Sequence, residues 1–99
     1  MEVAVVISAY SIERAEDIDE CLQSLRKQSL PPKEVILVLD SNEALFSFYK
    51  KRLKGQVQIV VSDTFGLSAA RNAGIKNSKS EFVAFIDDDA VADVEWLNR

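Results

Sequence analysis

The chain has 99 residues, of which 47% are hydrophobic and 28% charged, a composition typical of one globular domain with a single core. Its net charge of −4 argues against nucleic-acid binding, because a phosphate backbone has to be met by an excess of Lys and Arg. The sequence has no histidine and one cysteine, Cys21. A His-based triad and an internal disulfide are therefore excluded, and a typical zinc site is not expected.

The apolar runs of the chain are all short. None approaches the ~20 apolar residues that cross a bilayer, and no basic segment precedes the first run, as it would in a signal peptide. We therefore expect a cytoplasmic protein, with membrane association of the intact protein as an alternative.

The first apolar run, residues 3–7, predicts a strand that is buried on both faces, as in a parallel sheet. It is followed by the polar turn Ser8-Ala-Tyr-Ser11. Apolar residues then recur at helical spacing and predict an amphipathic helix that ends before Pro31-Pro32, since neither proline can continue a helix. This stripe consists of Ile18, Cys21, Leu22 and Leu25.

The second run, residues 34–39, repeats the strand pattern and stops at Asp40, where the sequence suits a turn or a helix N-cap. A helix is expected from about residue 43 to residue 53. Its inner stripe would consist of Leu45, Tyr49 and Leu53. That stripe does not account for both Phe46 and Phe48, so we expect one of them to be exposed or to contact a part of the protein that is missing from residues 1–99.

The third run, residues 57–61, predicts another strand, and residues 67–76 predict a helix. Small residues in this helix allow close packing or a closely bound ligand. They are Ala69, Ala70, Ala73 and Gly74. The fourth run, residues 82–86, is again continuous and leads directly into three aspartates, residues 87–89. A further helix is expected to start at Asp93.

This alternation of strands and helices predicts an α/β fold with three layers, a Rossmann-like parallel sheet with helices on both faces. Right-handed crossovers and short connections favour the strand order 3-2-1-4. The carboxyl ends of the strands then meet at one edge of the sheet, where open α/β sheets bind ligands. Strand 4 would leave an unpaired apolar edge, which favours a homo-oligomer formed through that edge.

Carboxylates dominate the chemistry expected at this edge. Three adjacent aspartates repel one another, so a site that keeps them ionised needs a cation or hydrogen-bond donors, and their oxygen ligands suit Mg²⁺ or Mn²⁺. A solvated acidic loop is the alternative. A metal on Asp88 or Asp89 would suit a nucleotide with a diphosphate, because it can bridge the phosphate oxygens. Asp40 can accept hydrogen bonds from a base or ribose, and Arg71 can donate a forked set to the nucleotide or fix the acidic loop.

Five segments of the chain match one known family. They are Val5-Val-Ile-Ser-Ala-Tyr10, Leu22-x-x-Leu25 with Gln28-Ser29, Glu34-Val-Ile-Leu-Val-Leu-Asp40, Gly66-Leu-Ser-Ala-Ala-Arg-Asn-Ala-Gly74 and Phe85-Ile-Asp-Asp-Asp89. Together they resemble the amino-terminal, nucleotide-sugar-binding half of a family 2 glycosyltransferase of the GT-A type, with the last segment as its DxD-type motif. Two positions depart from the family: Ser8-Ala-Tyr-Ser11 stands for Pro-Thr-Tyr-Asn, and Ser41 replaces a second acidic residue. Both positions lie where the family binds the nucleotide, so the identity of the nucleotide-sugar donor stays open.

The resemblance implies a donor-binding region that binds a nucleoside-diphosphate sugar, expected to be a UDP-sugar, through Mg²⁺ or Mn²⁺. It implies that Asp40 recognises the base and that Arg71 supports nucleotide binding. Asp88 would meet the ribose or the metal, and Asp89 would ligate the metal. The remaining candidates are Ala9, Tyr10 and Ser11 for nucleotide contacts and Asp87 for the nucleotide or the metal.

The resemblance also implies what residues 1–99 lack. Family members invert the anomeric centre with a carboxylate base that lies well beyond the acidic motif, as does the acceptor site, so we expect the catalytic base beyond Arg99. The chain would then be a truncated GT-A domain that binds nucleotide or metal but does not transfer sugar by itself. The alternative is a non-catalytic nucleotide- or metal-binding α/β module. A receiver-type phosphoacceptor domain would need an acidic cluster after the first strand, where this chain has Ser8-Ala-Tyr10.

Overall fold

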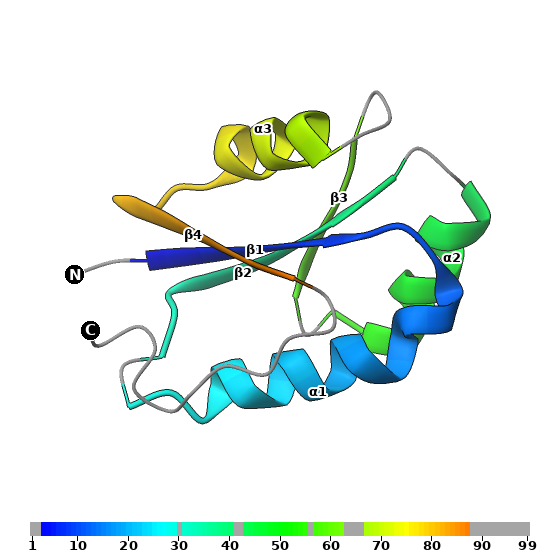
Figure 1. Ribbon diagram of the computed structural model, residues 1–99, viewed down its shortest axis with the longest axis horizontal. Coiled ribbons are helices and arrows are strands. Elements are labelled where there is room, and N and C mark those ends of the chain that lie inside the picture. The colour runs from blue at the N-terminus through cyan, green and yellow to red at the C-terminus, as the bar shows by residue number, and fades with distance from the viewer. Residues whose placement is uncertain (1–2, 30, 41–42, 56, 63–66, 88–99) are drawn as a thin grey trace.

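Strands and helices alternate along the chain (Figure 1). The computed structural model describes residues 3–29, 31–40, 43–55, 57–62 and 67–87. Its strands are β1 (Val3–Ala9), β2 (Glu34–Leu39), β3 (Gln58–Val61) and β4 (Phe82–Asp87). A short 3₁₀ segment, η1 (Ile12–Arg14), leads into α1 (Ala15–Arg26), and α2 (Glu43–Leu53) and α3 (Leu67–Asn77) complete the helices. No helix in this part of the chain has the length and apolar character needed to cross a bilayer.

The sheet is parallel and has the strand order β3-β2-β1-β4, which confirms the predicted 3-2-1-4 order. β1 lies inside the sheet and pairs with two neighbours. Its partners run from Ala4 opposite Glu34 to Ala9 opposite Leu39 in β2, and its pairing with β4 ends at Ser8 opposite Asp87. Because all strands point the same way, their carboxyl ends lie along one edge of the sheet.

Helices cover both faces of the sheet, as predicted: α1 and α2 lie on one side and α3 on the other (Figure 1). Successive strand residues point to opposite faces, so the sheet divides its apolar residues between two cores. The main core, under α1 and α2, takes Val5, Ile7, Ala9, Leu37 and Leu39. The smaller core, under α3, takes Val6, Ile36 and Val38, with Val60, Ala73 and Val83 packed against them.

The predicted inner stripes of the first two helices are confirmed. Every member of both is buried in the main core: Ile18, Cys21, Leu22, Leu25, Leu45, Tyr49 and Leu53. Neither Phe46 nor Phe48 is exposed, because both are half-buried against the main core. The first alternative given for them is therefore wrong, and a contact with a part of the protein outside residues 1–99 stays a prediction. Cations on the same helix lie over their rings, with Lys50 Nζ 5.6 Å from the Phe46 ring centroid and Arg52 Cζ 5.9 Å from that of Phe48.

Gly74 brings α3 unusually close to β1. A Cβ atom at this position would lie 2.5 Å from Cγ1 of Val6 and 2.9 Å from its Cγ2, closer than carbon atoms can approach. The sequence left close packing and a close ligand open for this glycine. The structure shows packing, since the space that a side chain would need is filled by Val6 of the central strand.

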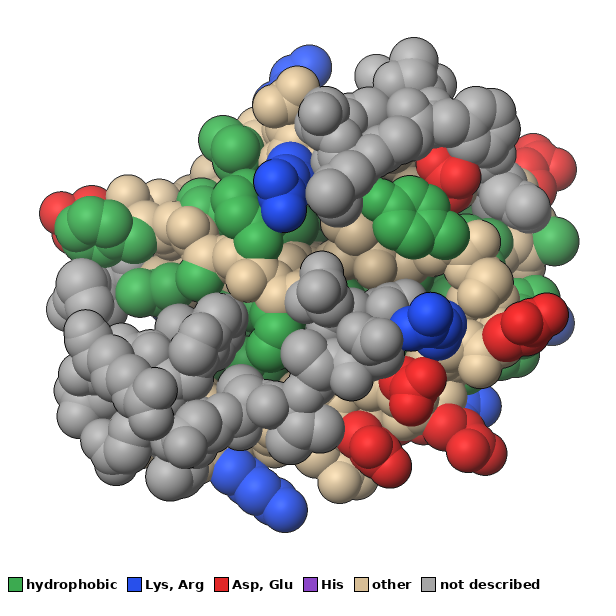
Figure 2. Space-filling model, in the orientation of Figure 1, with side chains coloured by type: hydrophobic (Ala, Val, Ile, Leu, Met, Phe, Trp, Pro, Cys, Tyr) green, Lys and Arg blue, Asp and Glu red, His purple; other side chains and the backbone are tan. Residues whose placement is uncertain are grey.

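β4 ends the sheet on one side. Within the described residues it pairs only with β1, so its other edge has no strand beside it. Hydrophobic side chains reach the surface over this strand (Figure 2), among them Phe82 and Phe85. The apolar edge expected from the sequence is therefore present in the described part of the chain.

Near the amino-terminal end of the sheet, the carboxylate of Glu34 at the start of β2 binds the turn before β4. It accepts hydrogen bonds from the Lys79 backbone N–H (3.0 Å to Oε2), the Ser80 hydroxyl (3.0 Å) and the Ser78 hydroxyl (3.2 Å), all in the turn between α3 and β4. The Lys79 N–H, and after it the two hydroxyls, lower the pKa of the Glu34 carboxyl below its usual value. The turn before β4 is thus tied to β2 across the first residues of β1.

Replacing Gly74 tests the close contact of α3 with β1. We expect Gly74→Ala to lower the free energy of unfolding by about 1–2 kcal/mol, because overpacking costs roughly 1–3 kcal/mol and the better helix propensity of Ala offsets up to about 1. Urea denaturation measures the change. Val6→Ala removes both atoms in conflict, so the double variant should be more stable than the sum of the single changes allows. Simple additivity would contradict the contact.

The Glu34 contacts predict a pH dependence of stability. Because folding lowers the pKa of this carboxyl, its contribution is complete above the unfolded pKa of about 4.3 and is lost as the pH falls through the lower folded value. Glu34→Gln, which carries no titrating charge, should be less stable than the unsubstituted chain at pH 7. The difference should shrink below about pH 4. Urea denaturation at several pH values measures it, and a difference that does not change with pH would contradict the role of the charge.

Candidate functional site

Three strand ends meet at the carboxyl edge of the sheet. Ala9 ends β1 opposite Leu39 of β2, and the Asp40 N–H donates to the Ala9 carbonyl at 3.2 Å. On the other side of β1, Asp87 pairs with Ser8 and is the last residue of β4. The register thus brings the turn after β1, Asp40 and the first aspartate of the triplet to a single edge, as the sequence predicts.

The turn after β1 combines a fixed backbone with an exposed ring. The Ser11 carbonyl accepts a 2.7 Å hydrogen bond from the hydroxyl of Tyr49, a fully buried residue of α2. The Tyr10 side chain, by contrast, is 46% exposed. An aromatic ring at the rim of a ligand site offers an apolar face to a flat ligand such as a base. Tyr49 holds the backbone of this turn in place while Tyr10 stays open to solvent.

Sequence reasoning placed Tyr49 in the core but missed its second role. The signal was the residue type itself, since a buried tyrosine hydroxyl almost always has a hydrogen-bond partner. The helical spacing of Leu45, Tyr49 and Leu53 shows which face is buried. It does not show that the hydroxyl reaches a carbonyl 38 residues away, next to the candidate site.

Asp40 lies between two neighbouring strand ends and is half-buried. The backbone N–H of Asp40 donates to the Ala9 carbonyl. The carbonyl of the preceding residue, Leu39, accepts a 2.8 Å hydrogen bond from the N–H of Ser62, which follows β3. Backbone contacts on both sides therefore fix its position at the edge. A carboxylate held there is suited to accept hydrogen bonds from the base or ribose of a nucleotide.

Arg71 reaches the site from the other layer. It is exposed on α3, and its guanidinium carbon lies 5.3 Å from the ring centroid of Phe85 in β4. Phe85 precedes Asp87 by two residues, so the Arg71 head group lies beside the last residues of β4. The structure thus brings Arg71 to the β4 side of the edge, whereas Asp40 and Tyr10 lie beyond β1 and β2.

The expected metal ligands fall largely outside the described residues. Asp88, Asp89 and the helix expected from Asp93 are not described, and for Asp87 the structure gives the backbone. Within the described ranges, no group of three or more His, Cys, Asp or Glu side chains gathers in a way that could hold a metal ion. The metal site at the aspartate triplet stays a prediction.

The expected position of the catalytic base is not tested by the structure either. The family resemblance implies a base beyond Arg99, and Arg99 lies outside the described residues, which end at Asp87. The assignment of the base to a segment after Arg99 therefore stays a prediction. No residue of the described part of the chain was expected to act as the base.

A separate hollow lies between α1 and α2, away from this edge. It has a volume of about 380 Å³ and is lined by residues of both helices, including Asp19 and Arg52, which form a 2.6 Å ion pair. None of the candidate site residues lines it. Because the ion pair is partly exposed, it contributes little to stability.

A family model named "Glycosyl transferase family 2" matches residues 4–99. The chain belongs to this family. Among its relatives, it is 35% identical over 101 aligned residues to the glucosyl-dolichyl phosphate glucuronosyltransferase of Haloferax volcanii, covering 98% of this chain and 32% of the relative. It is also 35% identical to the poly(ribitol-phosphate) beta-glucosyltransferase of Bacillus spizizenii, covering 100% of this chain and 16% of the relative. The chain thus spans a third or less of these two relatives.

Solved structures of S. aureus TarS match the fold. S. aureus TarS 1-349 in complex with UDP superimposes with a TM-score of 0.73 at 31% identity, covering 99% of this chain and 30% of that one. The complex of TarS 1-349 with UDP-GlcNAc gives the same TM-score at 29% identity, covering 99% and 29%. The match with TarS, a GT-A glycosyltransferase, confirms the predicted GT-A type of parallel sheet.

Proposed function

We propose that this family 2 glycosyltransferase chain is the donor-binding part of its domain and binds a nucleoside-diphosphate sugar at the carboxyl edge of the sheet. The observation that supports this most directly is the shared edge of the Ala9–Ser11 turn, Asp40 and Asp87, set by strand register and by the Asp40 amide bond to Ala9. The TarS complexes with UDP and UDP-GlcNAc add support, because that protein shares the fold over nearly the whole of this chain.

Each described residue of the edge has a proposed part. The half-buried Asp40 accepts hydrogen bonds from the base, and the exposed ring of Tyr10 next to it offers the base an apolar face. Arg71 contacts the nucleotide from the α3 side. Guanidinium donors match phosphate oxygens in pairs, so Arg71 is suited to the diphosphate.

The aspartate triplet is proposed to hold Mg²⁺ or Mn²⁺. Its donor set fits such an ion, because three successive carboxylates supply only hard oxygen ligands and their mutual repulsion favours a bound cation. Asp89, with Asp87 as the other candidate, would ligate the metal, and Asp88 would meet the ribose or the metal. A bound divalent ion would supply charge stabilisation for the leaving diphosphate. Arg71 and Asp40 would orient the nucleotide in that site.

Sugar transfer itself is proposed to need residues outside this chain. The chain spans 32% of the Haloferax relative and 30% of TarS 1-349, so most of each of those proteins has no counterpart here. We place the acceptor site and the carboxylate base for inverting transfer in a corresponding segment beyond Arg99. Residues 1–99 would then bind the nucleotide-sugar donor without transferring its sugar.

The binding proposal is tested by calorimetric titration of the chain with UDP, with and without Mn²⁺. We expect binding that depends on Mn²⁺, and at least ~10-fold weaker binding of Asp89→Ala, because loss of a ligand or its support weakens a metal site by that order. Asp17→Ala removes a carboxylate on α1 and serves as the matched control with unchanged binding. Equal affinity of Asp89→Ala and the unsubstituted chain would exclude the metal role. Absence of nucleotide binding in the presence of Mn²⁺ would contradict the function.

Self-association through β4 is a second part of the proposal. Two β4 edges can pair antiparallel about Ala84, which sets Phe82 of one copy against Ile86 of the other and Val83 against Phe85. Residues opposite each other then share a face of the joined sheet. Phe82 is 47% exposed and Phe85 37% exposed, so this register covers the two aromatic rings of the edge. Exposed apolar edge strands tend to pair in this way.

Sedimentation velocity over a range of concentrations tests the self-association. We expect a dimer that forms with rising concentration and is lost in Phe82→Lys, because a charge on an edge strand opposes edge pairing. Ile75→Lys adds the same charge at a site on α3 that is 50% exposed and should leave the dimer intact. A strictly monomeric unsubstituted chain at high concentration, or equal loss in both variants, would contradict pairing through β4.

A further inference from the structure

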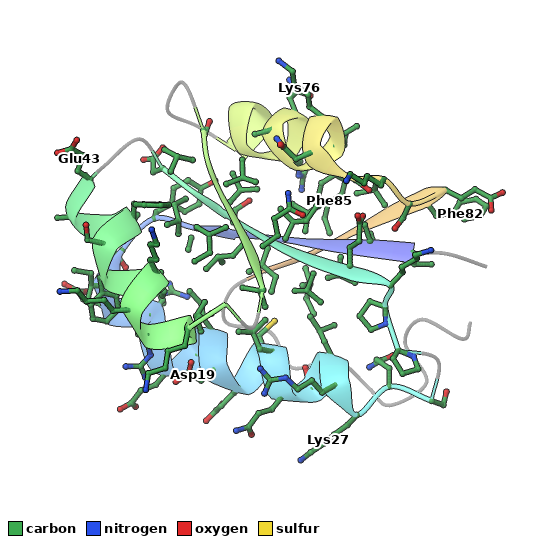
Figure 3. All side chains as sticks on the ribbon, turned by 180° about the vertical axis from the view of Figure 1, so that it is seen from behind. Asp19, Lys27, Glu43, Lys76, Phe82 and Phe85 are labelled. Carbon is green, nitrogen blue, oxygen red and sulfur yellow. The ribbon has the colours of Figure 1, made fainter. Side chains whose placement is uncertain are left out.

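Phe85 is more exposed than its place on the strand would predict. Val83 and Phe85 lie on the same face of β4, because strand residues alternate, and Val83 packs into the smaller core beneath α3. Phe85 is nevertheless 37% exposed. The guanidinium of Arg71 lies over its ring, with Cζ 5.3 Å from the ring centroid. Figure 3 shows Phe85 beneath α3.

The height of this contact along the strand follows from the packing of α3. Gly74 lies against Val6, and Val6 is the register partner of Phe85, so the middle of α3 is level with Phe85. α3 runs back from the carboxyl edge of the sheet, and Arg71 comes one turn before Gly74, nearer to that edge. Phe85 lies two residues before Asp87, which is roughly 7 Å along a strand. The guanidinium is thus held a short distance inside the site edge.

A cation–π contact leaves the hydrogen-bonding capacity of arginine intact. The guanidinium of Arg71 lies over the Phe85 ring, which attracts it through the charge distribution of the ring, so its five N–H donors stay available for an anionic ligand. The same contact restricts a long side chain that otherwise samples many rotamers. An arginine held in this way loses less freedom when it binds an anionic oxygen.

We propose that Phe85 is a positioning residue, which holds the guanidinium of Arg71 at the β4 side of the site so that it can bind the nucleoside diphosphate. The inference rests on the proposed function, since it takes Arg71 to be a nucleotide contact. It assigns a part to an apolar residue that precedes the aspartates of the acidic motif, and it predicts that Phe85 acts only through Arg71.

Four variants of the chain test this: Phe85→Leu, Phe85→Tyr, Arg71→Ala and the double variant of Phe85→Leu with Arg71→Ala. Phe82→Leu is the matched control, because Phe82 is an exposed ring of the same strand at 47% exposure but lies on the opposite face. The affinity for UDP with Mn²⁺ is measured by calorimetry. The proton signals of the Arg71 side chain are followed by NMR, since a guanidinium over a ring is shifted by the ring current.

We expect Phe85→Leu to weaken UDP binding about two- to fivefold, the size of an exposed cation–π contact. Phe85→Tyr keeps the ring and should retain the affinity. In the Arg71→Ala background, Phe85→Leu should have no further effect. The Arg71 signals should move in Phe85→Leu and stay in place in Phe82→Leu. These results would support the positioning role.

Other outcomes would overturn it. If the effects of Phe85→Leu and Arg71→Ala multiply, or if Phe82→Leu weakens binding as much as Phe85→Leu, then Phe85 does not act through Arg71. Arg71 signals that do not move in Phe85→Leu overturn the contact itself. If the unsubstituted chain binds no UDP with Mn²⁺, the proposed function fails, and the NMR comparison still decides whether Phe85 positions Arg71.

Discussion

The pairing of β1 with a parallel neighbour on each side governs the arrangement of this molecule. A strand with neighbours on both sides and helices over both faces has no room for polar side chains, and Ala4 to Ile7 are buried to 1% exposure or less. Polar groups can therefore appear only where the strand leaves the sheet. Because β2 and β4 point the same way as β1, their first polar residues appear at the same edge. The concentration of chemistry at that edge is a consequence of how the core is buried.

The two helical layers differ in how closely they approach this sheet, and the difference affects the site. α1 and α2 cover their face with large side chains, whereas α3 has Gly74 where it meets Val6. Because Gly74 has no side chain, the backbone of α3 lies close to the sheet. The side chain of Arg71 on this helix can then lie over the ring of Phe85 in β4. With a larger residue at position 74 the helix would have to move outward, and Arg71 would move with it. A packing requirement at β1 is thus coupled to the position of a candidate binding residue.

Much of this could be predicted from sequence because burial leaves a periodic pattern. The bounds of α2, the inner stripes of α1 and α2 and the strand order all follow from apolar spacing and crossover handedness. The pattern did not predict that both Phe46 and Phe48 are half-buried, because it treats the buried face of a helix as narrower than it is. Side chains at the border of that face are half-buried, and cations of the same helix lie over their rings.

The contacts that fix the site could not be predicted in the same way. They are the Tyr49 hydroxyl on the Ser11 carbonyl, the Glu34 carboxylate on the turn before β4, and the Arg71 guanidinium on Phe85. Each depends on which polar atoms meet once distant segments are placed together. Periodicity shows which side of a helix or strand faces inward, but it does not show which polar atoms of distant segments contact each other. The role of Asp88 and Asp89 depends on the family motif, since they lie outside the described residues.

Glu34 shows how a residue at the far end of the sheet bears on the site. Ala4 of β1 pairs with Glu34 on one side and Val83 on the other, so the Glu34 carboxylate, by binding the turn at residues 78–80, fixes where β4 begins relative to β1. A slip of one residue in β4 would turn every side chain to the opposite face. Phe85 would then point away from α3 and from Arg71, and the aspartate triplet would shift along the edge relative to Ala9. A strand has a single register along its length, and the contacts that select it at the amino end therefore also set the height of the carboxylates at the carboxyl end.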